Sequence, residues 1–364
     1  MMLAKFSVKN YRGFSERIEW DLATPNNYTE VIKDGIIKNG IIYGPNGSGK
    51  TNFGLALFDI VNHLGQKWRK LDYYANFVYV GKLNVPVEFE YVFKDADRII
   101  NYCYSKNNIG QLLTEKLSVD NILVFERTAR TFNIDTNEFP MENTTKRNLK
   151  DNANNVSIIN FLLTSYPLAK NHYLLTVLQF VDSMLWFRCL DTREFIGLDL
   201  APTNLDEYII QNNLVKDFSE FLHQVSDQKY QFANPRPNDK LLVCKIGGRD
   251  VIFDKIISTG TNALMLLYFW IQKMRSASFV FIDEFDAFYH FKLAFEVCKR
   301  LFALDCQVFT SSHNTYLMTN DLLRPDCNFI VNNNKIKPLS ACTQKELRFG
   351  HNIEKLFRGN AFQL

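Results

Sequence analysis

Apolar and polar positions alternate in short segments near the start of the chain. Residues 4–9 place an apolar side chain at every second position, and residues 16–22 repeat this pattern after a short turn. Two apolar pairs, at 36–37 and 41–42, then lead into a glycine-rich turn. The pattern predicts two antiparallel strands followed by a buried strand.

The spacing becomes helical after the glycine-rich turn. From residue 52 to about residue 64, apolar residues recur three and four positions apart, so strand, glycine turn and helix follow one another. Residues 86–93, 99–104 and 121–132 alternate again, which predicts an antiparallel lobe.

The middle of the chain has a different character. Residues 138–155 are polar and rich in Asn, Thr and Lys, which predicts an exposed loop and an internal boundary. Residues 156–192 and 205–226 carry apolar side chains at mixed helical spacing, and 241–253 reads as a hairpin that turns at two glycines. We therefore expect a mainly helical middle region.

The last part of the chain alternates helices and buried strands. An apolar helix is predicted over 261–274 and a second helix over 291–301, and each precedes a short apolar strand, at 278–282 and 307–312. Buried parallel strands read as continuous apolar runs of this kind. The whole pattern predicts an α/β fold.

Composition and charge fit an ordinary globular protein. The 364 residues are 46% hydrophobic and 22% charged, and 42 Lys and Arg against 39 Asp and Glu give a net charge of +3, which demands no polyanionic partner. The start of the chain has no apolar stretch long enough for a signal peptide or membrane span, so we expect a cytoplasmic location without membrane contact. Seven scattered cysteines without a CxxC pair are expected to be reduced.

The glycine-rich turn carries a phosphate-binding motif. Eight residues fit G-x-x-x-x-G-K-[ST]: Gly44, Pro45, Asn46, Gly47, Ser48, Gly49, Lys50 and Thr51. Its glycines let backbone N–H groups converge on phosphate oxygens at the positive end of the following helix. We expect Lys50 to bridge the β- and γ-phosphates of ATP and the Thr51 hydroxyl to ligate Mg²⁺. A glycine turn can fit this pattern by chance, but the flanking strand and helix favour a nucleotide site.

A pair of acids follows the strand at 278–282. Asp283 is predicted to lie on the metal side of an ATPase site, and Glu284 to accept a proton from the attacking water as general base. Many strands end in a solvated acidic turn, so the two acids indicate an ATPase site only in combination with the phosphate-binding motif.

Two further segments are candidates for phosphate contacts. His313 follows the strand at 307–312 and can hydrogen-bond the γ-phosphate, or it is a loop histidine without a role. Ser258 and Gly260 stand at the start of the helix that precedes the acidic strand. They form either an anion site or a helix N-cap without a ligand.

This order of motifs resembles the ABC-type ATPase heads of the SMC, RecF and DNA-repair families. Residues 6–14 are similar to the opening F-x-x-K-N-[FY]-R-x-F of those heads, in which the arginine approaches the nucleotide, so Arg12 is a candidate contact. Residues 351–359 resemble the C-terminal N-x-E-K-x-[YF]-x-x-G of stand-alone "AAA" ATPases in bacterial defence and abortive-infection operons, such as the ATPase subunits of PARIS and Septu.

The resemblance implies an ATPase head with an antiparallel β lobe and a mainly helical insertion. The head would span 1–137 and 236–364, and the polar loop and helical insertion 138–235. The sequence departs from the family at 258–261, which reads Ser-Thr-Gly-Thr instead of Leu-Ser-Gly-Gly-Gln, and the family's glutamine loop cannot be placed. Asp286 is expected to mark the dimer-facing loop.

In such heads the phosphate-binding loop of one subunit faces the signature of another. The resemblance therefore implies a homodimer or higher homo-oligomer with ATP between the heads. The segment after His313 is short for an additional catalytic domain, which suggests that the output lies elsewhere.

Three functions remain open. The first, favoured by the C-terminal motif and the helical middle, is a sensor or scaffold that detects a phage protein or DNA and controls a separately encoded, nuclease-like effector. The second is a RecF-like DNA-binding repair ATPase, for which the basic residues at 67–70 and 146–150 leave room. The third is an ATPase with its own nuclease activity in the insertion, although the middle lacks a His, Asp and Glu cluster for metal-dependent cleavage.

Overall fold

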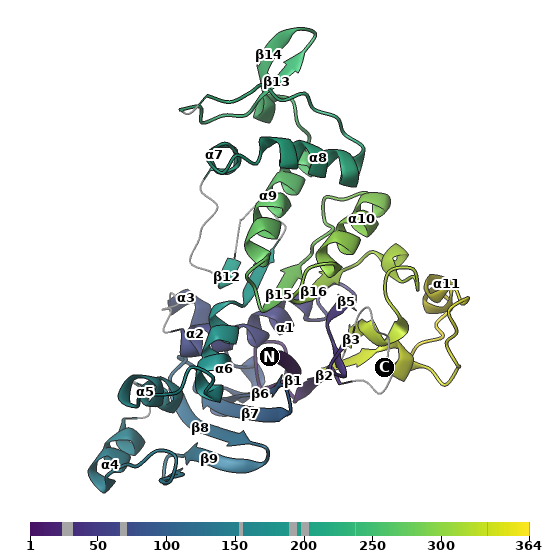
Figure 1. Ribbon diagram of the computed structural model, residues 1–364. Coiled ribbons are helices and arrows are strands. Elements are labelled where there is room, and N and C mark those ends of the chain that lie inside the picture. The colour runs from purple at the N-terminus through teal and green to yellow at the C-terminus, as the bar shows by residue number, and fades with distance from the viewer. Residues whose placement is uncertain are drawn as a thin grey trace.

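The computed structural model combines two large sheets with helices on their faces (Figure 1). It describes residues 1–23, 32–65, 71–152, 156–188, 195–197, 204–236, 238–332 and 334–363. The predicted α/β class is confirmed, with a largely parallel sheet that carries the phosphate-binding loop and a separate antiparallel lobe.

Within the described residues, the antiparallel lobe is a seven-stranded sheet. In sheet order its strands are β10 (Phe132–Ile134), β9 (Ile122–Arg127), β8 (Leu112–Val119), β7 (Arg98–Lys106), β6 (Val87–Asp95), β1 (Met2–Lys9) and β2 (Ile18–Asp21). The predicted pairing of the first two strands is confirmed, with Phe6 opposite Trp20. Strand β8 was not predicted because its buried face includes Glu115, which breaks the apolar alternation.

The second sheet contains the strand that precedes the predicted phosphate-binding loop. In sheet order it contains β12 (Phe195–Gly197), β11 (Leu185–Arg188), β15 (Phe279–Asp283), β16 (Gln307–Ser312), β5 (Asn39–Tyr43), β17 (Asn328–Asn332) and β18 (Lys335–Pro338). The strands from β11 to β17 pair in parallel, and β12 and β18 pair antiparallel at the two edges. Every residue of β5, β15 and β16 is buried, as their apolar runs predicted.

Helices connect and cover these strands. The helices of the N-terminal half are α1 (Lys50–Leu57), α2 (Asp59–Leu64), α3 (Leu71–Tyr74), α4 (Asn143–Asp151), α5 (Ile158–Ser165) and α6 (Tyr173–Asp182). The later ones are α7 (Leu205–Gln211), α8 (Val215–Ser226), α9 (Thr259–Met274), α10 (Phe291–Phe302) and α11 (Ile353–Arg358). Two short strands, β3 (Ile32–Lys33) and β4 (Ile36–Ile37), precede β5.

The prediction of helical structure over 156–192 is wrong in part. Helices α5 and α6 confirm it, but Leu185–Arg188 forms strand β11 next to β15. A short apolar run such as Leu185 to Phe187 cannot be assigned by periodicity alone, and residues 189–192 lie outside the described part of the chain. The division at 137 and 235 stays a prediction, although β11 from the middle range belongs to the core sheet.

The polar segment expected to be an exposed loop contains helix α4 instead. Leu149 of this helix packs partly against the core, and its carbonyl accepts a hydrogen bond from Arg127 Nη1 at 3.0 Å. Arg127 is fully buried in β9, so a distant side chain stabilises the end of a helix that local composition does not predict.

Helix α9 connects the core sheet to a projecting tip formed by α7, α8 and the hairpin of β13 (Val243–Ile246) and β14 (Arg249–Ile252) (Figure 1). The predicted hairpin is confirmed, and its turn glycines, Gly247 and Gly248, have φ of 55° and 78°. Among the described helices, none has the length and apolar character that crossing a membrane requires.

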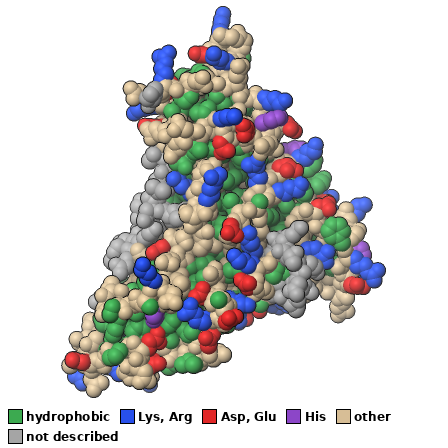
Figure 2. All heavy atoms as spheres, viewed as in Figure 1, with side chains coloured by type: hydrophobic (Ala, Val, Ile, Leu, Met, Phe, Trp, Pro, Cys, Tyr) green, Lys and Arg blue, Asp and Glu red, His purple; other side chains and the backbone are tan. Residues whose placement is uncertain are grey.

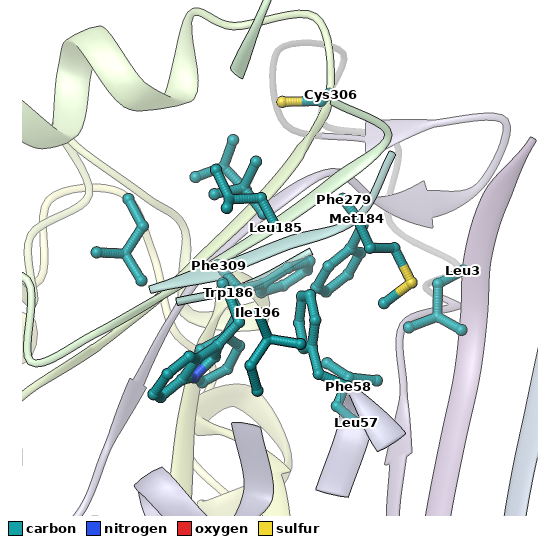
Figure 3. Packing of buried hydrophobic residues seen from close by; sticks show 14 of the residues in the cluster. Leu3, Leu57, Phe58, Met184, Leu185, Trp186, Ile196, Phe279, Cys306 and Phe309 are labelled. Atoms are coloured by element: carbon teal, nitrogen blue, oxygen red, sulfur yellow. The ribbon is translucent and has the colours of Figure 1, made fainter. Parts of the chain in front are cut away.

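Large aromatic side chains fill the space between α1 and the core sheet. Figure 3 shows Phe58, Trp186 and Phe279 in this cluster. A Cβ at Gly54 would lie 2.8 Å from the Phe281 ring and 2.9 Å from the Trp186 indole nitrogen, so glycine lets α1 approach the sheet closely. This contact fixes the helix that begins with Lys50.

Candidate functional site

The phosphate-binding loop lies between β5 and α1, as predicted. Gly47 and Gly49 have φ of 76° and 100°, in the left-handed region that favours glycine. A Cβ at Gly44 would lie 2.4 Å from Ser48 Oγ and 2.6 Å from the Val331 carbonyl oxygen. The motif glycines are therefore needed for the conformation and the close packing of this loop.

Lys50 is folded back onto the loop. Its Nζ donates hydrogen bonds to the carbonyl oxygens of Gly44 at 2.8 Å and Pro45 at 3.2 Å, and the residue is 6% exposed. Burial lowers the pKa of Lys50, and the charges of Asp283 and Glu284 act in the opposite direction. The amine thus lies above the loop, within the electrostatic influence of both predicted acids.

Asp283 ends β15 in a fully buried position and accepts hydrogen bonds on both carboxylate oxygens. Thr51 Oγ1 donates to Oδ2 at 2.8 Å, and Ser311 Oγ donates to Oδ1 at 2.6 Å. The structure therefore brings the last residue of the phosphate-binding motif to the predicted metal-side acid. Their binding of magnesium stays a prediction.

Arg188 also reaches this carboxylate, and sequence reasoning missed it. It ends β11 directly opposite Asp283 in the strand register, and its Nε donates to Asp283 Oδ2 at 3.2 Å. No local motif marks this arginine. Knowledge that β11 pairs with β15 would have identified this arginine, but the order of the strands in the sheet cannot be derived from one sequence.

Glu284 is half-buried and His313 is exposed, and both lie within the electrostatic influence of Lys50. The backbone of Glu284 is left-handed, with φ of 50°, and its N–H donates to Ser311 Oγ at 2.8 Å. His313 is exposed, and its pKa is lowered first by partial burial and then by the charge of Lys50, while Glu284 acts in the opposite direction. These side chains therefore share one electrostatic environment, as their predicted roles require.

Asp286 connects the loop after β15 to the loop after β16. Its Oδ2 accepts a hydrogen bond from Ser312 Oγ at 2.7 Å, and the same hydroxyl accepts one from the Asn314 N–H at 2.9 Å. Burial raises the pKa of Asp286, and the hydrogen bond from Ser312 opposes this effect. The chain on both sides of His313 is held by this carboxylate.

Ser258 is the N-cap of α9. Its Oγ accepts a hydrogen bond from the Thr261 N–H at 3.2 Å, which satisfies one of the free donors of the first turn. A Cβ at Gly260 would lie 3.3 Å from the Phe288 carbonyl oxygen, so this turn packs closely on the segment after Glu284. Ser258 itself is exposed. The geometry satisfies the N-cap interpretation, and contact with a partner's phosphate stays a prediction.

Arg12 lies in a turn beside α1, with φ of 46°. Its guanidinium carbon lies 5.5 Å from the ring centroid of Tyr73 and 5.6 Å from that of Tyr11. The same turn reaches the phosphate-binding loop, because a Cβ at Gly49 would lie 2.8 Å from the Phe14 ring. The contact between Arg12 and the nucleotide stays a prediction.

The site has the groups that magnesium and a nucleoside triphosphate require. Thr51 and Asp283 supply the hard oxygen ligands that magnesium prefers. Ser48 Oγ is buried in the loop without a hydrogen-bond partner among the residues that the structure describes, and the loop is too tightly packed for a Cβ at Gly44. A glycine cradle with an unsatisfied hydroxyl, beside a lysine and a metal-type carboxylate, fits ATP with magnesium.

Comparison with known proteins gives fold-level likenesses only. No protein-family model and no curated protein matches the sequence. An SMC head domain from Thermotoga maritima is similar over 93% of this chain and 99% of its own, with a TM-score of 0.46 and 15% identity. An Smc head bound to the C-winged helix domain of ScpA is similar over 93% and 96%, with a TM-score of 0.47 and 15% identity. An Smc head with an extended coiled coil, bound to the C-terminal domain of ScpA derived from Pyrococcus furiosus, is similar over 92% and 95%, with a TM-score of 0.44 and 14% identity.

Proposed function

We propose that this chain is an ABC-type ATPase that binds and hydrolyses ATP with magnesium. The hydrogen bond between Thr51 Oγ1 and Asp283 Oδ2 carries this proposal, since it joins the phosphate-binding loop to the acidic strand. Lys50 lies above the same loop, and Glu284 follows Asp283 directly. A phosphate-binding loop, its lysine and two neighbouring acids are groups that nucleotide hydrolysis uses, and their closeness supports the proposal.

The residues have separate tasks in this reaction. Backbone N–H groups of the loop bind the phosphates, and Lys50 exchanges its two carbonyl partners for phosphate oxygens. Magnesium, held by Thr51 and Asp283, would neutralise charge on the β- and γ-phosphates. Glu284 accepts the proton of the attacking water, and His313 donates a hydrogen bond to the γ-phosphate. A lowered pKa keeps that imidazole neutral near neutral pH, with one N–H to donate.

We further propose that ATP holds two heads together. The start of α9, a helix of 16 residues, presents Ser258 and Thr259 to solvent, and a helix N-terminus favours an anionic ligand. In a homodimer or higher homo-oligomer, the γ-phosphate on one subunit would meet this turn of another. Binding would then favour association, and hydrolysis would favour release.

The proposed biological role is control of a separately encoded, nuclease-like effector in defence against phage. The C-terminal segment that resembles defence ATPases forms α11, where Asn352 caps the helix by accepting from the Lys355 N–H at 2.8 Å. Glu354 accepts a hydrogen bond from Thr315 Oγ1 at 3.2 Å, and Thr315 lies two positions after His313 in the sequence. This contact supports communication between the motif and the nucleotide site. The region 156–226 is the proposed docking surface.

A DNA-binding repair ATPase remains the alternative. Lys67, Arg69 and Lys70 lie outside the described residues, whereas Lys146, Arg147 and Lys150 lie on α4. On the face in Figure 2, basic and acidic side chains are interspersed. The described side chains on that face therefore show no continuous basic track of the kind that DNA binding would use.

Phosphate release by the purified protein tests the ATPase proposal. Wild type should hydrolyse ATP with magnesium, Lys50→Ala should lose nucleotide binding, and Glu284→Gln should bind ATP while its hydrolysis falls by about a hundredfold or more. Asp305→Asn, a surface change elsewhere, is the matched control for loss of one carboxylate. Equal rates in wild type and Glu284→Gln would refute the assignment.

The biological role needs a second experiment. Cells that express the chain with its neighbouring gene are challenged with phage and compared with cells that express either gene alone. We expect protection that needs both genes and an intact Lys50. Protection or toxicity from this chain alone would contradict the scaffold proposal.

A further inference from the structure

Arg188 and Thr51 donate hydrogen bonds to the same carboxylate oxygen of Asp283. Its Nε donates to Asp283 Oδ2 at 3.2 Å, and Thr51 Oγ1 donates to the same oxygen at 2.8 Å. The shared oxygen follows from the backbone, because Arg188 and Asp283 are register partners on adjacent parallel strands. The guanidinium is thus positioned by the sheet itself.

The guanidinium compensates a charge that is costly to bury. The Asp283 side chain is fully buried, and a buried carboxylate is stable only with hydrogen-bond donors and a nearby cation. Thr51 and Ser311 supply neutral donors, whereas Arg188 forms an ion pair and cannot lose its proton in a protein.

A second contact orients this arginine. Its guanidinium carbon lies 6.0 Å from the ring centroid of Trp186, two positions earlier on β11. Trp186 is fully buried and packs beside Gly54 of α1, so it is fixed by the helix that also carries Lys50 and Thr51. The Arg188 side chain is only 23% exposed. The cation is therefore held at the inner edge of the site rather than in solvent.

We infer that Arg188 is a positioning residue that supplies part of the positive charge which magnesium would otherwise bring to Asp283. This inference rests on the proposed ATPase function. Without a cation beside it, Asp283 repels the phosphates of a bound nucleotide. The guanidinium reduces that repulsion in the absence of metal. It therefore also reduces the further increase in nucleotide affinity that magnesium brings. Arg188 thereby makes nucleotide binding less dependent on magnesium.

The test is the ratio of two dissociation constants for a non-hydrolysable ATP analogue, measured by calorimetry in EDTA and in excess magnesium. We expect Arg188→Ala to raise the ratio of the EDTA value to the magnesium value by about two- to fivefold over wild type, which corresponds to an ion pair worth up to about 1 kcal/mol. Arg188→Lys keeps the charge and should stay close to wild type. Arg98→Ala removes a similar pair with Asp95, 2.8 Å apart in the β lobe, and should leave the ratio unchanged.

Each outcome separates this inference from the function on which it rests. If wild type binds no nucleotide under either condition, the proposed ATPase function fails. If wild type binds and Arg188→Ala shows the wild-type ratio, or loses affinity equally in both conditions, the arginine is merely structural and the inference is wrong. Should Arg188→Ala fail to fold, Arg188→Gln against Arg188→Lys compares a neutral with a charged side chain, and equal ratios would again overturn it.

Discussion

Thr51 donates a hydrogen bond to Asp283 at 2.8 Å, across 232 positions of sequence. The contact joins the first turn of α1 to the end of β15, so the Thr51 hydroxyl fixes the carboxylate and keeps a lone pair for the proposed metal.

Removal of this hydroxyl should weaken metal-dependent nucleotide binding. We expect Thr51→Ala to lower the affinity for ATP with magnesium by at least about tenfold, whereas Thr51→Ser keeps the hydroxyl and should stay within about threefold of wild type. Calorimetric titration of both variants checks this. An unchanged affinity in Thr51→Ala would show that the hydroxyl does not serve the metal.

Dimerisation should depend on the turn at the start of α9. In a Glu284→Gln background, we expect ATP with magnesium to double the mass measured by light scattering, because hydrolysis no longer separates the heads. Ser258→Arg should abolish this increase, since a bulky cation fills the turn that would receive the partner's phosphate. Ser276→Arg, an exposed position just beyond the other end of the same helix, is the control. A mass that responds neither to nucleotide nor to Ser258→Arg would remove the trans contact.

Lys50 should reduce the stability of the nucleotide-free protein. Its pKa is lowered by burial, so the folded state disfavours the charged form, and this cost is present below the folded pKa and fades as pH rises through it. We expect Lys50→Met to raise the melting temperature at about pH 7, and to raise it by less at about pH 10. The variant should also lose the stabilisation that ATP gives to wild type. A lower melting temperature for Lys50→Met at neutral pH would contradict this explanation.

A buried ion pair connects α2 to the β lobe. Lys106 Nζ lies 2.6 Å from Asp59 Oδ2, and the two side chains are 4% and 0% exposed. Lys106→Met leaves the Asp59 charge buried with Tyr104 as its hydrogen-bond donor, and should cost about 3–5 kcal/mol of unfolding free energy. Lys116→Ala breaks a pair with Glu126 in which both side chains are much more exposed, and should cost less than about 1 kcal/mol.

Urea unfolding measures both changes, and Asp59→Asn combined with Lys106→Met should cost less than the sum of the single changes. An equal loss of unfolding free energy in Lys106→Met and Lys116→Ala would mean that burial does not determine how much the Lys106–Asp59 ion pair contributes to stability.

The placement of the phosphate-binding loop and the acidic strand could be predicted because local chemistry determines both. The loop needs glycine at Gly44, Gly47 and Gly49, and the buried strand before Asp283 reads as an apolar run. Arg188 could not be predicted, because its contact depends on which strand lies next to β15. Nothing in the residues around it distinguishes a site arginine from a surface arginine.

Helix α4 is a second feature that local sequence could not predict. Its composition favours a loop, and its formation depends on Leu149 reaching the core and on Arg127 from β9. Such long-range contacts override weak local propensity, and they are visible only once the fold is known.

The order of the core strands also determines when the site can form during synthesis. Strand β5 pairs with β16 and β17, and both of these strands are synthesised late, near the C-terminal end of the chain. At about 5–20 residues per second, translation leaves the apolar residues of β5 without sheet neighbours for roughly tens of seconds. The proposed nucleotide site therefore cannot form until Ser312 and the residues beyond it have left the ribosome, and until then both edges of β5 need protection from wrong pairing.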